Sequence, residues 1–114
     1  MKAIILSLFL SLPTGEYSTE KSYQVATCKG RIEYKLDDST RVDCLTAKNA
    51  IEYDFAQKWH EALGQSLHYA RMTERKAGIV LIFKKETDLK YYHRLMQTIA
   101  ENCLKIDVWI IKED

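Results

Sequence analysis

The stretch Ala50-Ile-Glu-Tyr-Asp-Phe55, followed by residues 56–73 and by Gly78-Ile-Val-Leu-Ile-Phe83, decides the fold of this chain. Residues 50–55 are rich in β-branched and aromatic side chains, which favour a strand. In residues 56–73 apolar side chains recur every three or four positions, which predicts an amphipathic helix. Residues 78–83 form a continuous apolar run, which is typical of a central strand covered on both faces.

The segments on either side extend this strand–helix–strand unit. Residues 31–36 alternate between apolar and polar side chains, which indicates a half-buried strand. A turn cluster at residues 37–40 and a second strand at residues 41–46 complete a hairpin. Residues 86–103 have a helical period, and residues 106–111 predict a final strand. The order predicts an α/β domain, in which helices pack against a mixed sheet.

Length and composition are those of one globular domain. The chain has 114 residues, of which 46% are hydrophobic and 29% are charged. One proline and four glycines leave no candidate linker. The net charge of +1 gives no simple electrostatic argument for nucleic acid. It does not exclude nucleic acid, because a few local Lys and Arg side chains can hold a phosphate.

The N-terminus has the pattern of a signal peptide. Met1-Lys2 is a positively charged start, Ala3 to Leu12 is apolar, and Pro13 interrupts the run. The run is too short to span a bilayer and suits a signal-peptide core. We therefore expect residues 1–20 to be removed and residues 21–114 to be an exported domain, periplasmic or secreted, that is not in the membrane. The alternative is a buried N-terminal strand or helix.

The three cysteines, Cys28, Cys44 and Cys103, have no zinc-binding spacing. In an oxidising compartment two of them can pair. Cys28 directly precedes the first predicted strand and Cys44 lies on its hairpin partner, so we expect a Cys28–Cys44 disulfide.

Four acidic residues fall on three consecutive predicted strands, each opposite the apolar side of its own strand: Glu33, Asp43, Glu52 and Asp54. Clustered carboxylates repel one another and shift each other's pKa values. A divalent cation removes that repulsion, and hard oxygen ligands suit Mg²⁺ or Mn²⁺. The pattern predicts a divalent metal site. An ordinary solvated strand face is the alternative that the alternation leaves open.

Polar residues on the following helix form a narrow seam. Lys58, Gln65 and Tyr69 stand at i, i+7 and i+11, so they fall within about 40° of one another around a helix. They lie beside the apolar face, and we expect them to approach Asp43 and Glu52 around one cleft. The alternative is an amphipathic boundary with a snorkelling lysine.

Together these segments resemble the PD-(D/E)XK nuclease superfamily over roughly residues 28–85. In that family an Asp ends one strand, and an acidic residue and a lysine, two positions apart, follow on the next. The stretches that match are Arg41-Val-Asp-Cys-Leu-Thr46, Ala50-Ile-Glu-Tyr-Asp-Phe55, Lys58-Trp59 and Gly64-Gln-Ser-Leu-His-Tyr69. The resemblance puts Asp43 and Glu52 at the two acidic positions. Gln65 and Tyr69 match the QxxxY motif of the RecB and lambda exonuclease branches.

The resemblance implies a restriction endonuclease-like fold: a minimal αβββαβ core, here with a further C-terminal helix and strand. It implies that Asp43 and Glu52 hold Mg²⁺ or Mn²⁺ with the Tyr53 carbonyl, and that Asp54 and Glu33 are candidate additional ligands. The expected activity is metal-dependent hydrolysis of nucleic acid, with DNA as the expected partner.

One position departs from the family pattern. Asp54 stands where the family has a lysine, and an aspartate cannot supply the positive charge that orients or activates water. Lys58 is the candidate replacement, since some family members move the lysine to this helix. Gln65 and Tyr69 would then orient the site or contact the nucleic-acid backbone. The alternative function is a catalytically inactive exported interaction module that keeps the nuclease fold.

Overall fold

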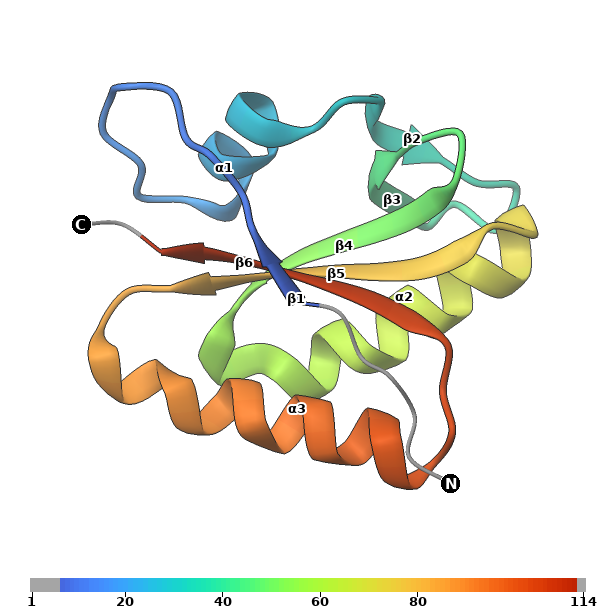
Figure 1. Cartoon of the computed structure of the whole chain (residues 1–114). Helices are drawn as coiled ribbons and strands as arrows, with labels where there is room; N and C mark the ends of the chain where they lie inside the picture. The colour runs from blue at the N-terminus through green and yellow to red at the C-terminus, as the bar shows by residue number, and fades with distance from the viewer. Residues whose placement is uncertain (1–6, 113–114) are drawn as a thin grey trace.

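A six-stranded mixed sheet forms the centre of the protein, and the computed structural model describes residues 7–112 (Figure 1). The sheet has the strand order β1-β6-β5-β4-β3-β2. The elements in chain order are β1 (Ser7–Phe9), α1 (Glu20–Thr27), β2 (Arg31–Lys35), β3 (Arg41–Leu45), β4 (Asn49–Phe55), η1 (Ala56–Lys58), α2 (Trp59–Thr73), β5 (Lys76–Phe83), η2 (Glu86–Asp88), α3 (Leu89–Glu101) and β6 (Ile106–Lys112).

The sheet combines an antiparallel and a parallel half. Strands β2, β3 and β4 form an antiparallel meander. Strands β4, β5 and β6 are parallel, because α2 and α3 carry the chain back between them. The short strand β1 adds to the outer edge of β6, also in parallel. From α1 onward the order is αβββαβαβ, so the predicted α/β fold class with a mixed sheet and flanking helices is confirmed.

Helices cover both faces of the sheet, as Figure 1 shows, with α1 on one side and α2 and α3 on the other. The core on the α1 side joins Tyr23 to Tyr53 and Val80. The larger core on the opposite side joins Leu95 and Ile99 of α3 to the apolar residues of β5 and β6. Because both faces are covered, alternate residues of the central strands are buried on either side.

Helix α1 is not evident in the hydrophobic pattern. It has eight residues, and only Tyr23 and Gln24 are buried. Its start is fixed by a capping box, in which Thr19 and Ser22 exchange side-chain and backbone hydrogen bonds. Other differences are at the element ends: 3₁₀ turns precede α2 and α3, and β5 begins at Lys76 rather than at Gly78.

The predicted Cys28–Cys44 disulfide is confirmed, with a Cα–Cα distance of 5.8 Å. It fastens the end of α1 to β3, while Cys103 is an exposed free thiol. Residues 7–9 of the apolar N-terminal run form β1, and residues 1–6 lie outside the described part of the chain. Removal of residues 1–20 stays a prediction. Within residues 7–112, no helix is long and apolar enough to cross a membrane.

Candidate functional site

The regular pairing of β3 with β4 stops at Asp43. The two strands pair through Leu45 with Ala50 and Cys44 with Ile51, and the paired positions end there. Beyond them, the Asp43 Oδ2 atom accepts a hydrogen bond from the backbone N–H of Tyr53 over 2.8 Å. A carboxylate therefore occupies a position where a strand normally offers a backbone carbonyl, and β3 and β4 separate around it.

The neighbouring strand β2 is also irregular beside Asp43. Ile32 pairs with Cys44 and Tyr34 pairs with Val42, so Glu33 falls opposite Asp43. Glu33 has a φ of 55°, an uncommon left-handed conformation for a residue with a side chain. Backbone strain of this kind gathers at functional sites. The Glu33 side chain pairs with Lys21 at 3.5 Å.

Glu52 lies beside Asp43 and is buried, with only 5% of its surface exposed. Burial, the hydrogen bond with Asp43 and the Asp43 charge together raise the pKa of Glu52 to about 11. Burial also raises the pKa of Asp43, while the hydrogen bonds from Glu52 and the Tyr53 N–H oppose that rise. The two carboxyl groups therefore share one proton, held by Glu52. The Glu52 Oε2 atom is buried and has no hydrogen-bond partner.

Asp54 forms a second acidic contact, with a residue that the sequence pattern did not reveal. Asp54 is 4% exposed, and burial together with the charge of Glu20 raises its pKa to about 8. Asp54 and Glu20 share a hydrogen bond, and the positive charge of Lys58 acts in the opposite direction. Lys58 Nζ lies 3.8 Å from Glu20 Oε1. Glu20 opens α1, and the only sequence sign of it is its place after the capping residue Thr19.

Tyr69 reaches the same region from α2. Its ring is 6% exposed and packs with Val42, Leu45 and Ala50. Burial and then the charges of Glu52 and Asp43 raise its pKa above the ordinary tyrosine value. Gln65 lies one turn earlier on α2 and is exposed. Among the described residues, no hydrogen bond joins Gln65 to the acids.

The burial of Glu52 and Asp54 argues against the solvated strand face as an explanation for the acidic pattern. The four acids, however, do not converge as one ligand set. Asp54 is bonded to Glu20 and Glu33 is paired with Lys21, so Asp43 and Glu52 are the acids that the structure brings together. Within residues 7–112, no group of three or more His, Cys, Asp or Glu side chains is arranged to hold a metal ion.

The number and type of ligand atoms that Asp43 and Glu52 offer nevertheless suit a Mg²⁺ or Mn²⁺ ion. Mg²⁺ keeps several waters and is commonly held by one or two carboxylates. Asp43 and Glu52 offer that number of hard oxygen ligands, and the unpartnered Glu52 Oε2 leaves one of them unsatisfied. Binding would require the loss of the shared proton, so affinity for the cation should rise with pH.

Comparisons of this chain with protein-family models, with curated proteins and with solved structures find no match.

Proposed function

We propose that this protein is a metal-dependent nuclease of the PD-(D/E)XK class, which hydrolyses phosphodiester bonds of nucleic acid, with DNA as the first substrate to test. The observation that carries the proposal is the carboxyl pair of half-buried Asp43 and buried Glu52, where β3 and β4 separate. Buried carboxyl groups that share a proton are costly to keep in a fold, and perturbed pKa values of this kind gather at functional sites.

The order of the elements supports the same class. The chain runs through a helix, three antiparallel strands, a helix and a parallel strand, which is the αβββαβ order of the family's minimal core. Asp43 lies on the second of these strands and Glu52 on the third, as the motif requires. Glu20 on the first helix adds a further acid near them.

In this proposal Asp43 and Glu52 hold Mg²⁺ or Mn²⁺, and Tyr53 is the candidate for a carbonyl ligand. When bound, such an ion lowers the pKa of a water molecule and stabilises negative charge on the phosphate. Lys58 holds the water or the phosphate in place through its positive charge. Tyr69 packs behind the acids and keeps α2 against β4, and Gln65 is available on the exposed side of α2 to contact the nucleic-acid backbone.

The experiment that tests this function combines metal binding with cleavage. Titration of the purified protein with Mn²⁺ in a calorimeter should show one site, and end-labelled DNA and RNA should be cut only when Mg²⁺ or Mn²⁺ is added. Asp43→Ala, purified in the same way, controls for a contaminating nuclease. If wild-type protein binds no divalent ion, both the site and the function are wrong.

A second candidate function is a catalytically inactive exported module that keeps this fold. The observations that favour it are Asp54 in the lysine position and the contact of Lys58 with Glu20, which offsets the lysine charge. Mn²⁺ binding without cleavage of any DNA or RNA would favour this module over the nuclease.

The proposal places the mature protein outside the cytoplasm, in the periplasm or secreted. The Cys28–Cys44 disulfide supports this location, because disulfides persist in oxidising compartments and are rare in the cytosol.

A further inference from the structure

A basic hollow opens at the beginning of the β2–β3 hairpin, away from the Asp43–Glu52 pair. Its cavity volume is about 290 Å³, and its lining includes three cationic residues, one aromatic ring and the turn after β3: Lys29, Arg31, Arg75, Tyr34 and Thr46. No acidic residue lines it. Lys29 belongs to the chain just after α1, and Arg75 lies in the turn between α2 and β5. Two segments far apart in the sequence, residues 29–31 and Arg75, therefore bring positive charge to one place.

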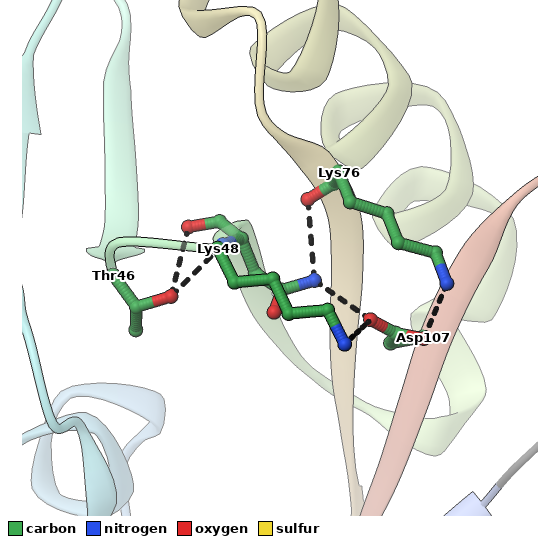
Figure 2. Close-up of polar contacts among 5 residues, drawn as sticks. Thr46, Lys48, Lys76 and Asp107 are labelled. Carbon is green, nitrogen blue, oxygen red and sulfur yellow. Dashed lines mark hydrogen bonds and ion pairs between the residues drawn. The ribbon is translucent and has the colours of Figure 1, made fainter.

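The charges of this basic hollow are not cancelled locally. Among the described residues, none of the three cationic side chains forms an ion pair with a carboxylate. The neighbouring lysines differ in this respect, as Figure 2 shows. Asp107 lies 2.8 Å from Lys76 Nζ and 3.9 Å from Lys48 Nζ. Asp107 also accepts a hydrogen bond from the Asn49 side chain over 2.9 Å, so it is fixed beside those two lysines.

Arg75 is held in place before any ligand arrives. Its guanidinium donates to the backbone carbonyl of Thr46, and Thr46 itself is fixed by hydrogen bonds with the backbone of Asn49. Arginine has five N–H donors, so one bond to a carbonyl leaves others for an anion. A guanidinium that is already oriented loses less conformational entropy when it binds a phosphate.

Tyr34 gives the basic hollow an exposed aromatic surface. It is 36% exposed and lies on β2, the edge strand of the sheet. The Arg31 guanidinium carbon lies 5.8 Å from the centre of the Tyr34 ring. A positively charged groove beside an aromatic ring is the combination that single-stranded nucleic acids bind, because bases stack on the ring and phosphates contact the cations.

We infer that this basic hollow binds the backbone of a single-stranded nucleic acid, with a base stacked on Tyr34 and phosphates at Lys29, Arg31 and Arg75. The inference rests on the proposed function for its choice of nucleic acid as the ligand. Thr46 and Asp43 are three positions apart on or beside β3, roughly 10 Å along a strand. A single strand of a few nucleotides is therefore long enough to extend from the basic hollow to the Asp43–Glu52 pair.

The experiment measures binding without cleavage. Fluorescence anisotropy in EDTA follows binding of a labelled 12-nucleotide oligo-dT, its oligo-U counterpart and a DNA duplex of the same length. We expect both single strands to bind more tightly than the duplex. Tyr34→Ala should weaken binding of the single strands by at least about fivefold, and Tyr34→Phe should restore it, because the base stacks on the ring. Lys29→Ala, an exposed change, should lower the slope of log K against log salt by about 0.7.

Lys90→Ala is the matched control, since it removes an exposed lysine from α3 and should leave binding unchanged. The inference is overturned if Lys29→Ala and Tyr34→Ala bind as wild type does, if Lys90→Ala weakens binding equally, or if the duplex is preferred. The two proposals fail separately. Binding at the basic hollow without metal-dependent cleavage would contradict only the proposed nuclease function. Metal-dependent cleavage with wild-type affinity in the Lys29→Ala and Tyr34→Ala variants would contradict only the proposed binding site.

Discussion

The Asp43 carboxylate accepts a hydrogen bond from the backbone N–H of Tyr53 over 2.8 Å, at the point where the pairing of β3 with β4 stops. One side chain thus has two roles. It satisfies a backbone donor that the strand pairing leaves without a carbonyl, and it holds a negative charge beside the protonated Glu52. These two roles can be separated by the choice of substitution.

Asp43→Asn should keep the stability of the fold and lose metal binding and cleavage. Asp43→Ala should lower the stability and also lose metal binding and cleavage. Asparagine retains an oxygen that accepts from the Tyr53 N–H, but it has no negative charge for a cation. Alanine leaves that N–H without its partner, which costs about 1–3 kcal/mol where the group is buried. Urea unfolding measures the difference in stability, and Mn²⁺ calorimetry with a cleavage assay measures the site. We expect both variants to lose metal binding and roughly three orders of magnitude in cleavage.

Asp37→Ala is the matched control, because it removes an exposed acid from the neighbouring hairpin turn. It should behave as wild type in all three measurements. Full cleavage by Asp43→Asn would contradict the assignment of Asp43 as a ligand.

Glu52→Gln should make the metal-free protein more stable at alkaline pH. The folded-state pKa of Glu52 is raised to about 11 from the ordinary 4.5, so the folded state binds a proton more tightly than the unfolded chain. The stability from Glu52 is therefore fully present below pH 4.5 and is lost progressively as the pH rises from there toward 11. Glutamine is neutral throughout and can donate to Asp43 as the protonated acid does.

Thermal unfolding in EDTA at pH 5 and pH 9 checks this prediction. The melting temperature of Glu52→Gln should exceed that of wild type by several degrees at pH 9 and by little at pH 5, since about 1 kcal/mol shifts it by roughly 4–8 °C in a domain near this size. An equal shift at the two pH values would mean that Glu52 does not hold the shared proton.

The strands and long helices could be predicted because periodicity reflects burial, but the site depends on contacts that periodicity does not contain. Alternation puts Glu52 and Asp54 on the side of β4 opposite Tyr53, and α2 then covers that side as well. Glu20 reaches Asp54 from α1, a helix too short to be stable alone, which depends on Tyr23 packing and on the disulfide after it. Both contacts, α2 against β4 and Glu20 against Asp54, join residues that are far apart in the sequence, so local periodicity does not predict them.

The predicted polar seam of Lys58, Gln65 and Tyr69 does not form as one face of a helix. At 100° per residue, Lys58 would lie on the same side of a helix as Gln65 and Tyr69, but Lys58 ends the 3₁₀ turn η1. A 3₁₀ turn has three residues per turn, so the angle between Lys58 and the residues of α2 differs from the helical value. Lys58 accordingly lies near Glu20 at the end of β4, while Gln65 is exposed on α2.

Removal of the Cys28–Cys44 disulfide should destabilise the protein by about 3 kcal/mol, because the bridge joins residues 16 apart and restricts the unfolded chain. The double variant Cys28→Ser/Cys44→Ser should match reduced wild type in urea unfolding and should not respond to dithiothreitol. Cys103→Ser, at the exposed free thiol, is the control and should keep wild-type stability. A double variant that unfolds at the same urea concentration as oxidised wild type would contradict the prediction.

Export should be visible in the mass of the protein purified from its own cell. We expect the mature chain to begin near residues 15–22, because the apolar run from Ala3 to Leu12 after Lys2 suits a signal peptide. A start no later than Thr19 keeps the cap of α1 and the contact of Glu20 with Asp54. The intact mass should also be lower by two hydrogens than that of the reduced chain, as the Cys28–Cys44 bridge requires. An intact Met1 on cytosolic protein would count against export and would favour β1 as a lasting part of the sheet.

Lys58→Ala should spare metal binding and lower cleavage by about 10²-fold, the range for one side chain that assists proton transfer or positions water. The reason is its place: Lys58 lies beside Glu20 and Asp54, not between Asp43 and Glu52. Lys58→Arg keeps the charge and should recover part of the activity, while Lys105→Ala, an exposed lysine before β6, should have no effect.

Single-turnover cleavage and Mn²⁺ calorimetry on the same preparations separate the role of Lys58 in cleavage from a role in metal binding. If Lys58→Ala cleaves at the wild-type rate, Lys58 does not supply the positive charge that Asp54 cannot provide. If it also loses Mn²⁺, Lys58 supports the site by holding Glu20 and Asp54 in place.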